Sequence, residues 1–495
     1  MIRRPPRSTQ GVSSAASDVY KRQIIIYMNP IVRFAPSPTG QLHIGGVRTA
    51  LFNYAFAKKH NGAFLIRIED TDKERSKDEY TVQILDSLKW LGLEFKGEPI
   101  KQSTRTERYN EVINYLLETG NAYRCFTSSD ELQELREKSE SYLYPGIWRD
   151  RPNEEIESKL KDGVPFTIRL RIPESGKVDF EDLVYDKIST DISELDDFII
   201  ARSDGSPTYN LTVVVDDHDM DISHVIRGED HISNTPKQLM IYKAMDWDSP
   251  AFGHLPMILG SDGKRLSKRH GAKGTQAYKE LGYFSDSLIN YLALLGWNPG
   301  NEDEIFNLQY LIENFSFDRV NKKSAVFDTV KLDWVSSQNI MNKSTNELLD
   351  LIKDFDSNWL NEDFSDEYLR KVIVLIRERL KTLSDVKTNS DYFFNDPKEY
   401  DEKSLQKCWH DSTSQIIEEF YLELEKISTW NSTSIDELIA SFVQNQGIGF
   451  GKLMQPLRVA LTGALIGPSI PDMIEVLELE TCKRRFQNIL DFKLK

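Results

Sequence analysis

Two short stretches of the 495-residue chain carry residue types that could bind a polyphosphate. The first is PSPTGQLHIGG at residues 36–46, in which His43 precedes the pair Gly45 and Gly46. Glycines let a ligand approach the backbone closely, and a helix that begins beside them offers its N–H groups to phosphate. His43 stands where its ring could donate to a phosphate oxygen. The alternative is that His43 is an ordinary polar loop residue and the glycines only turn the chain.

The second stretch is GSDGKRLSKRHG at residues 260–271, a loop with cations beside three glycines. The cations are Lys264, Arg265, Lys268 and Arg269. Such a loop suits a mobile clamp that neutralises a polyphosphate. A run of basic residues is also compatible with a plain solvated surface. Each stretch alone therefore leaves the function open.

A parallel crossover unit is predicted around the first stretch. Residues 31–35 form an apolar run typical of a buried strand, and apolar residues at helical spacing follow from Gly46 to a capping signal at 61–62. Residues 63–68 read as a second strand that ends in the acidic group Glu69, Asp70 and Asp72. Ligands of such sheets bind beyond the carboxyl ends of the strands, so this turn and the acidic group should share one rim.

Further helices are predicted from the apolar periodicity of the rest of the chain. They span residues 73–91, 105–117, 235–245, 368–383 and 405–427. The acidic run VVVDDHDMD is predicted to be a turn with capping roles, and residues 256–259 a short strand. No strand pattern is found after about residue 306.

Taken together, these stretches resemble the motifs of one enzyme family. PSPTGQLHIGG is similar to the HIGH motif of class I aminoacyl-tRNA synthetases, and RLSKR is similar to their KMSKS motif. RFAPSPTG, RIEDTD, DGSPTYN and VIRGEDH, in this order, resemble the bacterial-type glutamyl-tRNA synthetase subfamily. The resemblance runs from about residue 31 to the C-terminus. It implies an ATP-dependent ligase that attaches L-glutamate to tRNA-Glu through a glutamyl-adenylate intermediate.

The resemblance also implies a set of site residues. The catalytic residues would be His43 and Lys268, of which Lys268 would neutralise charge on the β- and γ-phosphates. ATP would be bound by Gly40, His43, Gly45, Gly46, Asp230, Leu266 and Lys268. Glutamate would be bound by Arg33, Ser37, Glu69, Tyr209 and Arg227.

Of the two arginines in this set, Arg33 is expected to contribute most to selection of the glutamate side chain. Arg227 would assist or hold the α-carboxylate, because an arginine fork matches a carboxylate in two-point geometry. The alternative for Arg33 is a structural ion pair with Glu69 or Asp70.

The implied fold class is an α/β Rossmann-type catalytic domain with an inserted α+β acceptor-binding domain, followed by an all-α C-terminal anticodon-binding region. The expected boundaries are 28–121 and 197–260 for the catalytic halves, 122–196 for the connective insertion, 261–345 for the KMSKS loop and stem-contact helices, and 346–495 for the anticodon-binding helices. Residues 1–27 are basic and serine-rich and are expected to be a non-native or disordered leader, with Met28 as the true start. A transit peptide has a similar composition.

No dedicated metal site is expected, and Mg²⁺ should arrive with ATP. Some relatives carry structural zinc in the insertion. Here Cys125 is the only cysteine of that region, and no histidine lies between His60 and His218, so we expect no structural zinc. A metal site built from His218, His224 and His231 is the alternative interpretation of the acidic run.

Composition limits the functions that fit. A formal net charge of −16 argues against indiscriminate nucleic-acid binding, although it allows a local basic surface. No apolar run approaches the length of a membrane span, and the three cysteines are far apart, which favours a reducing compartment. We expect a cytoplasmic monomer with no membrane partner.

Three rival functions are considered. The first is a non-discriminating enzyme that also charges tRNA-Gln with glutamate. The second is a glutaminyl-tRNA synthetase, which reads RFPPEP where this chain reads RFAPSP and whose anticodon part consists of β-barrels. The third is a non-catalytic RNA-binding protein on the same fold. The helical pattern of the C-terminal part argues against the second, and the intact motifs around His43 and Lys268 argue against the third.

Overall fold

The computed structural model describes residues 29–72, 74–139, 142–267, 273–356, 359 and 364–493. These residues form two compact units, the first ending at residue 277 but including 289–328, and the second comprising 278–288 and the chain from 329 on. The leader predicted at residues 1–27 lies outside the described residues. No helix within the described ranges is long and apolar enough to cross a membrane.

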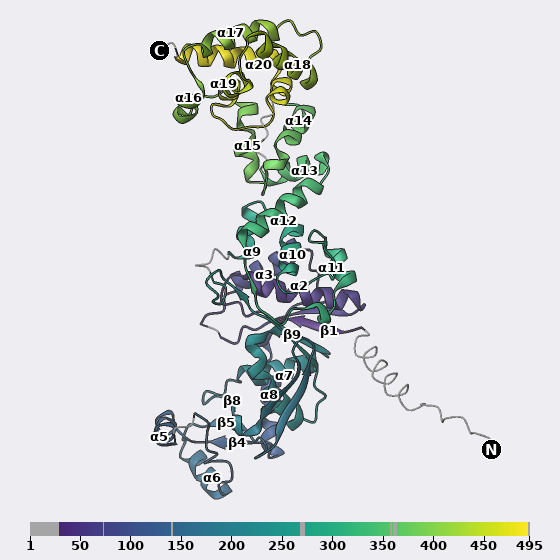
Figure 1. Cartoon of the computed structure of the whole chain (residues 1–495). Helices are drawn as coiled ribbons and strands as arrows, with labels where there is room; N and C mark the ends of the chain where they lie inside the picture. The colour runs from purple at the N-terminus through teal and green to yellow at the C-terminus, as the bar shows by residue number, and fades with distance from the viewer. Residues whose placement is uncertain are drawn as a thin grey trace, which may run out of the picture. The chain divides into compact units, whose positions relative to one another are not determined.

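Within the described residues, a seven-stranded sheet forms the centre of the first unit (Figure 1). Its order is β3-β2-β1-β9-β10-β6-β7, and neighbours run parallel except for the antiparallel pair β6–β7. The strands are β1 Ile31–Phe34, β2 Ala63–Ile68, β3 Ile100–Lys101, β6 Lys177–Asp182, β7 Asp186–Asp191, β9 His224–Gly228 and β10 Ala251–Leu255. The strand order reverses between β1 and β9, which places a crevice beyond the carboxyl ends of these two strands.

The predicted crossover unit is confirmed. β1 pairs with β2 in parallel register from Ile31↔Ala63 to Phe34↔Ile66, and α2 (Ile44–Lys59) connects the two strands. Most of α2 is buried, including residues such as Phe52 and Asn53 on different sides of the helix. A helix that is enclosed in this way cannot rotate or slide, so its N-terminus is held firmly at the rim of the sheet.

The rest of the first unit contains two smaller sheets and further helices. A three-stranded antiparallel sheet in the described part of the chain comprises β4 Ala122–Cys125, β5 Thr167–Leu170 and β8 Ile199–Ala201. Strands β11 Ile258–Leu259 and β12 Ala325–Val326 pair in parallel. The helices are α3 Asp78–Trp90, α4 Thr106–Glu118, α5 Ser129–Ser139, α6 Asn153–Lys161, α7 Tyr209–Asp219, α8 Thr235–Ala244 and α11 Leu308–Asn314, with α9 Thr275–Glu280 and α10 Ser285–Leu294 at the boundary of the units.

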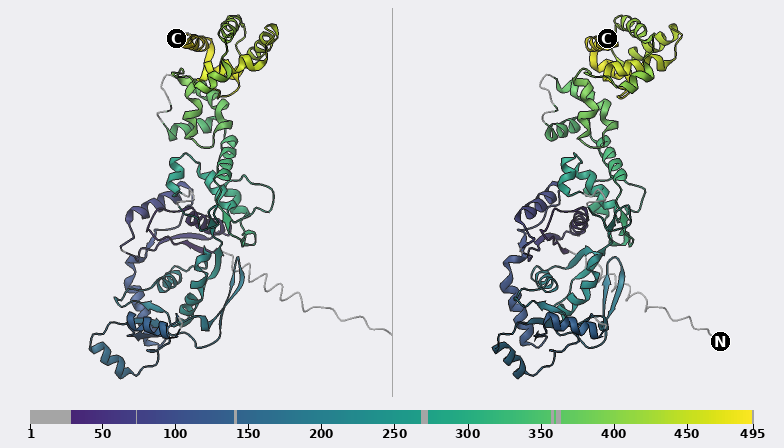
Figure 2. Two further views of the ribbon diagram at one scale, coloured as in Figure 1. Left: turned by 60° about the vertical axis from the view of Figure 1, so that its left-hand side comes forward. Right: turned by 90° about the vertical axis from the view of Figure 1, so that its left-hand side faces the viewer.

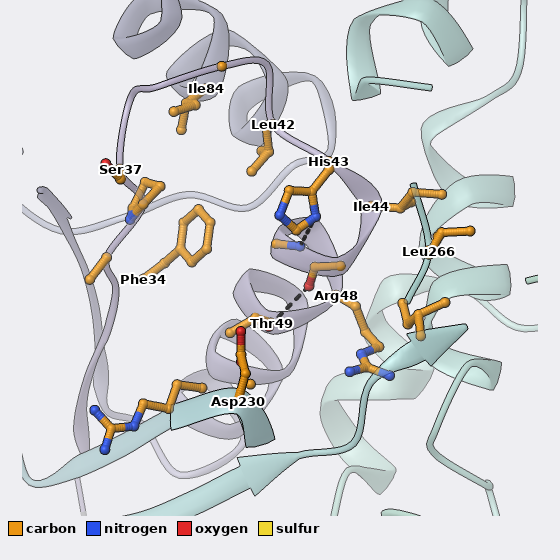
Figure 3. Close-up of a pocket in the computed structure, with 18 of the residues that line it drawn as sticks. Phe34, Ser37, Leu42, His43, Ile44, Arg48, Thr49, Ile84, Asp230 and Leu266 are labelled. Atoms are coloured by element: carbon orange, nitrogen blue, oxygen red, sulfur yellow. Dashed lines mark hydrogen bonds between the residues drawn. The ribbon is translucent and has the colours of Figure 1, made fainter. Parts of the chain in front are cut away.

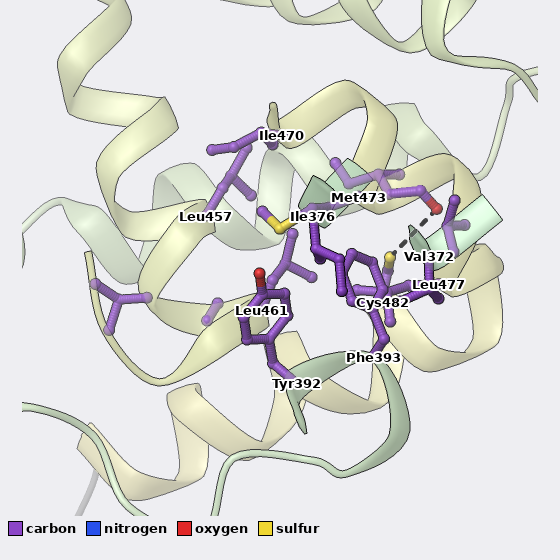
Figure 4. Packing of buried hydrophobic residues seen from close by; sticks show 14 of the residues in the cluster. Val372, Ile376, Tyr392, Phe393, Leu457, Leu461, Ile470, Met473, Leu477 and Cys482 are labelled. Carbon is purple, nitrogen blue, oxygen red and sulfur yellow. Dashed lines mark hydrogen bonds between the residues drawn. The ribbon is translucent and has the colours of Figure 1, made fainter. Parts of the chain in front are cut away.

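Within the described residues, all regular secondary structure of the second unit is helical, as both views in Figure 2 show for the green and yellow part of the chain. Its helices are α12 Thr329–Asn342, α13 Thr345–Phe355, α14 Asp366–Ile376, α15 Asp385–Phe394, α16 Glu402–Cys408, α17 Thr413–Leu424, α18 Ser432–Asn445, α19 Phe450–Thr462 and α20 Ile470–Lys493. Leu461, Ile470 and Met473 pack in its apolar core, which Figure 4 shows from close by. The prediction of a helical C-terminal region is confirmed.

The acidic run at residues 216–221 is not the turn that the sequence predicts. Its residues up to Asp219 form the C-terminal part of α7, and both Asp216 and Asp217 are buried there. The helix tolerates these buried charges because arginines from β1 and β2 neutralise them. Local sequence carries no sign of partners that lie this far away in the chain.

Other predicted elements differ in their extent. The helix predicted at 73–91 begins only at Asp78, since Asp72 accepts the Arg75 N–H at 3.1 Å and holds a turn before it. The prediction of no strand after about residue 306 is wrong, because β12 pairs with β11, although two residues are too short to leave a pattern. Strand β10 was not predicted, and the strand predicted at 256–259 is reduced to β11.

The two long helices predicted in the second unit are each broken. Within the segment 368–383, α14 ends at Ile376. The next residue, Arg377, donates from Nη2 to the carbonyls of Met341 and Lys343, both at 2.7 Å, near the end of α12. The segment 405–427 is split between α16 and α17, where the His410 N–H donates to Thr413 Oγ1 at 2.9 Å. These tertiary and local contacts override helix propensity.

Candidate active site

A pocket of about 770 Å³ lies beyond the carboxyl ends of β1 and β9. Every predicted site residue that the structure describes lines it. These residues are Arg33, Ser37, Gly40, His43, Gly45, Gly46, Glu69, Tyr209, Arg227, Asp230 and Leu266. The predicted clamp residue Lys268 and its neighbour Arg269 lie outside the described residues. Segments as far apart in sequence as those of Arg33 and Leu266 therefore meet at one rim of the sheet.

His43 is the N-cap of α2, and its Nδ1 accepts the Gly46 N–H at 3.2 Å (Figure 3). Because Nδ1 is the acceptor, a neutral ring carries its proton on Nε2. Burial lowers the pKa of His43, and the charge of Arg265 lowers it further. A Cβ at Gly45 would lie 3.1 Å from His43 Nδ1, so glycine there leaves room for the ring. His43 thus both caps the helix and retains a neutral N–H donor for a ligand.

Arg33 forms a buried two-point ion pair with Asp217. Its Nε lies 2.9 Å from Asp217 Oδ1, and its Nη2 lies 3.2 Å from Oδ2. The predicted alternative partners, Glu69 and Asp70, do not occupy this position. Although burial raises the pKa of Asp217, the charges of Arg33 and Arg67 outweigh that effect and hold the pKa below its usual value. The charge of Arg33 is therefore offset within a buried network, in which Asp217 also pairs with Arg67 and Arg67 with Glu69.

Arg227 is also buried, but its partners are uncharged. Its Nε donates to His254 Nε2 at 3.2 Å, and its Nη2 donates to Thr235 Oγ1 at 2.9 Å. Its Nη1 is buried without a hydrogen-bond partner among the described residues. Burial lowers the pKa of Arg227. An unsatisfied donor on a buried cation costs free energy, and a carboxylate ligand would remove that cost.

The remaining residues predicted to bind glutamate supply further polar groups. Ser37 Oγ donates to the Glu69 carbonyl at 3.0 Å, and Glu69 Oε1 lies 3.1 Å from Arg67 Nη2. Burial raises the pKa of Glu69, and Arg67 opposes the rise. Burial also raises the pKa of Tyr209 to about 12, so its hydroxyl, 3.1 Å from His231 Nδ1, keeps its proton. The pocket thus offers the Glu69 carboxylate for an ammonium group and a phenol for hydrogen bonding.

The described part of the basic loop lies against the same pocket. Leu266 donates its N–H to the Ile258 carbonyl at 2.9 Å, which ties the loop to β11. Arg265 Nη2 lies 3.3 Å from Asp230 Oδ2, and both side chains are partly or largely exposed. Figure 3 shows Leu266, Asp230 and His43 reaching the site from three different segments. The stretch that carries Lys268 therefore begins at the pocket.

Several residues behind the pocket were not predicted. Asp217 and Arg67 support Arg33 and Glu69, while Asp182 and His254 lie behind Arg227. One signal was available: the buried strand AFLIRI contains an arginine, and a buried charge requires a partner. Nothing in the local pattern of the partners themselves marks them.

The alternative metal site has no support from the arrangement of its histidines. His218 stacks on Trp247 with ring centroids 3.8 Å apart, and His231 contacts Tyr209. His224 packs against Phe56. Within the described ranges, no group of three or more histidine, cysteine, aspartate or glutamate side chains could hold a metal ion.

Comparison with known proteins shows a family match over most of the chain. Residues 31–334 match the family described as tRNA synthetases class I (E and Q), catalytic domain, and residues 347–490 match the family described as anticodon binding domain. The chain therefore consists of a class I catalytic domain on a mostly parallel sheet and a separate, mostly helical anticodon-binding domain.

Individual relatives agree with this assignment. Glutamate–tRNA ligase 2 of Thermoanaerobacter pseudethanolicus is 40% identical over 93% of this chain and 98% of its own length. Glutamate–tRNA ligase 1 of Bartonella tribocorum is 42% identical over 91% and 96%. The crystal structure of a glutamate tRNA ligase from Elizabethkingia meningosepticum, in complex with its amino acid, is 33% identical, covers 94% of this chain and 99% of that one, and superposes with a TM-score of 0.86. The chain therefore belongs to the glutamate–tRNA ligase family of class I tRNA synthetases.

Proposed function

We propose that this protein is a glutamate–tRNA ligase that uses ATP to join L-glutamate to tRNA-Glu. The observation that carries the proposal is a single pocket in which neutral His43 at the N-terminus of α2 accompanies Arg227, a buried cation with an unsatisfied Nη1. A polyphosphate would be complementary to the N-terminus of α2 with His43, and a dicarboxylic amino acid would be complementary to Arg227.

The reaction proceeds in two steps. The α-carboxylate of glutamate attacks the α-phosphate of ATP, which gives glutamyl-adenylate and releases pyrophosphate. The terminal adenosine hydroxyl of the tRNA then attacks the activated carbonyl carbon, which forms the ester and releases AMP. Neither step needs a covalent enzyme intermediate, so positioning and charge stabilisation provide the catalysis.

Each residue has a role that follows from its chemistry. His43 Nε2–H and the N–H groups at the start of α2 hold ATP phosphates, and Lys268 neutralises the charge that develops on the leaving pyrophosphate. Glu69 binds the α-ammonium group. Arg227 Nη1, with Arg33 beside it, binds a glutamate carboxylate. Mg²⁺ arrives with ATP, since magnesium commonly bridges phosphates without a dedicated protein cage.

The tRNA contacts are proposed from the family resemblance and from the division of the chain. The small sheet of β4, β5 and β8 with helices α5 and α6 is the part that we assign to the inserted acceptor-binding domain. The hairpin β6–β7 lies in the segment expected to be the insertion but extends the central sheet. The helices after residue 346 would bind the anticodon. A cytoplasmic monomer is likewise part of the proposal.

Two alternatives concern the choice of substrate. An enzyme that also charges tRNA-Gln with glutamate would differ in its anticodon contacts. A glutaminyl-tRNA synthetase would differ at the amino-acid side chain, and a buried cation is a poor match for its neutral amide. The relatives named above are glutamate–tRNA ligases and do not favour that second alternative.

The test is aminoacylation of tRNA-Glu and tRNA-Gln, measured separately with glutamate and with glutamine. Charging of tRNA-Glu with glutamate is the expected result, and no charging under any condition would contradict the proposal. Charging of tRNA-Gln with glutamate would identify the non-discriminating enzyme.

The variant Lys268→Ala should lower the rate of adenylate formation about a hundredfold or more, the usual loss for one preorganised electrostatic donor. The rate is measured as glutamate-dependent ATP–pyrophosphate exchange in the presence of tRNA, and the KM for glutamate should change little. Lys96→Ala, an exposed residue between α3 and β3 that does not line the pocket, is the matched control. A rate within a few-fold of the control would show that Lys268 is not part of the clamp.

A further inference from the structure

Two buried residues that do not line the pocket lie directly behind Arg227. His254 on β10 is the cross-strand neighbour of Arg227 on β9 in the parallel register of these strands. Asp182, the last residue of β6, lies opposite Phe252 on the other side of β10. The side chains of His254 and Asp182 are both fully buried, and His254 Nδ1 lies 2.6 Å from Asp182 Oδ2. A buried row therefore runs from a carboxylate through an imidazole to a guanidinium.

The hydrogen bonds of this row allow one protonation state of the imidazole. Asp182 Oδ2 can only accept, so His254 Nδ1 carries a proton. Arg227 Nε–H can only donate, so His254 Nε2, 3.2 Å away, carries a lone pair. The ring is therefore neutral, and burial also lowers the pKa of His254. A second proton on Nε2 would face the Arg227 N–H and add a positive charge beside it.

The orientation of Asp182 is itself determined. Its Oδ1 accepts three backbone N–H groups, from Val184 and Tyr185, both at 2.9 Å, and from His254 at 3.3 Å. This oxygen is therefore occupied in the turn between β6 and β7, and the other oxygen is directed to His254. The carboxylate has no rotational freedom left, so it selects the imidazole tautomer in the manner by which a buried aspartate orients a catalytic histidine.

We propose that Asp182 and His254 are positioning residues for Arg227: they hold its guanidinium through an uncharged acceptor and leave its full charge for a carboxylate of the amino-acid substrate. This inference rests on the proposed function. Arg33 provides the contrast, because Asp217, which also pairs with Arg67, holds it by a two-point ion pair that offsets its charge. A carboxylate in place of His254 would fix Arg227 equally well but would compete with the substrate. A neutral acceptor orients the cation without that competition.

The decisive variant is Asp182→Asn, which keeps the size and shape of the side chain. The amide oxygen must remain at the Oδ1 position to accept the Val184 and Tyr185 N–H groups, so its NH₂ faces His254 Nδ1. His254 must then accept at Nδ1 and carry its proton on Nε2, where it opposes the Arg227 N–H. Glutamate-dependent pyrophosphate exchange in the presence of tRNA is expected to show a KM for glutamate raised about tenfold or more, with the KM for ATP changed less than about twofold.

The control is Asp179→Asn on the same hairpin, an exposed residue that bonds Ser189 and Lys187 rather than His254. It should match the wild-type protein in both constants. An unchanged KM for glutamate in Asp182→Asn would overturn the inference, and so would an equal rise of both KM values, which would indicate a general structural role. Wild-type protein without any glutamate-dependent exchange would instead contradict the proposed function.

A second pair of variants keeps the test decisive if Asp182→Asn does not fold. The carbonyl of His254→Gln reaches roughly the position of Nε2 and accepts from Arg227, whereas His254→Leu has a similar volume and no acceptor. The KM for glutamate should be at least about fivefold higher in His254→Leu than in His254→Gln. Equal values in the two variants would exclude a role for the Nε2 acceptor. ¹⁵N spectra of histidine-labelled wild-type protein should show a neutral ring protonated on Nδ1 that disappears in both variants, and a ring protonated on Nε2 would contradict the assignment.

Discussion

At the scale of single residues, the pocket contains two arginines with different charge balance. Arg33 is matched by Asp217, whereas Arg227 is bound by a neutral imidazole and a hydroxyl and has an unsatisfied Nη1. A buried ion pair is nearly neutral as a unit, so its arginine attracts a further carboxylate less than an unmatched one does. We therefore propose that Arg227, rather than Arg33, is the main recognition residue for a carboxylate.

We accordingly expect Arg227→Gln to reduce the preference for glutamate over glutamine more than Arg33→Gln does. Glutamine differs from glutamate by an amide, and its NH₂ group set against an arginine donor leaves both without an acceptor. The preference, expressed as the ratio of kcat/KM values in pyrophosphate exchange with tRNA present, should fall about a hundredfold or more in Arg227→Gln. The reverse ranking of the two variants would restore the main role to Arg33.

The lowered pKa of His224 leads us to expect that the stability of the first unit depends on pH. This residue is 1% exposed, and burial, followed by the charge of His60, lowers its pKa to about 4. The unfolded chain, with a histidine pKa of about 6.5, binds more protons than the folded chain between these values. The stabilisation of the folded state that neutral His224 provides is therefore fully present above about pH 6.5, and it is lost as the pH falls toward 4.

The free energy of unfolding is expected to fall by up to about 1.4 kcal/mol for each pH unit of acidification because of this one histidine. Denaturant unfolding of wild-type protein and of His224→Gln at several pH values between 7 and 4.5 measures it. The variant should have a shallower pH dependence because glutamine takes up no proton. Identical slopes would show that His224 does not contribute.

At the scale of the secondary-structure elements, α2 determines the position of the proposed phosphate site. Its apolar sides are enclosed by the sheet and by α11, and its first turn is held by the His43 cap. We propose that His43 has both a structural and a catalytic role: Nδ1 satisfies a backbone donor, and Nε2–H remains for the substrate. These two roles are separable because Asn is an N-cap residue that lacks a group equivalent to Nε2–H.

His43→Asn and His43→Ala should therefore differ in stability but not in activity. Both variants lose the Nε2 donor and should lower pyrophosphate exchange by about a hundredfold. Only His43→Ala also loses the cap, at a cost of about 1 kcal/mol in the free energy of unfolding. Denaturant unfolding alongside exchange kinetics separates the effects, and full activity in His43→Asn would show that the ring is only a cap.

At the scale of the whole molecule, the chain consists of two compact units with separate cores. The core of the second unit includes Leu461, which is fully buried between α19 and the other helices of that unit (Figure 4). Leu422 on α17 belongs to the same unit but is 54% exposed. This pair of leucines allows the second unit to be destabilised with a matched control.

Leu461→Ala should destabilise the second unit by about 2–5 kcal/mol, because it removes buried methyl groups and leaves a cavity. Hydrogen exchange should become faster across residues 347–490 and stay unchanged across 31–267. Leu422→Ala should change neither by more than about 0.5 kcal/mol. Equal acceleration in both units of Leu461→Ala would show that they unfold together.

Local signals in the sequence predicted the catalytic framework well. The crossover unit from β1 to β2 depends on apolar runs, a glycine pair and a capping signal, which act over a few residues. Helix α7 was not predicted, because its stability depends on partners that are distant in the sequence. Its buried aspartates resemble a polar turn until Arg33 and Arg67 are brought against them by the sheet.

The sequence by itself determined the family, the crossover unit and a set of residues that line the pocket, since motifs and periodicity are properties of neighbouring residues. Only the tertiary structure decided which arginine is matched and which is not. Asp217 lies 184 residues from Arg33, and the single register pair Phe252↔Asp182 brings the hairpin β6–β7 to the central sheet, where Asp182 meets His254. The charge available to a substrate depends on such distant partners, because burial makes every charge respond to whatever the fold places within a few ångströms of it.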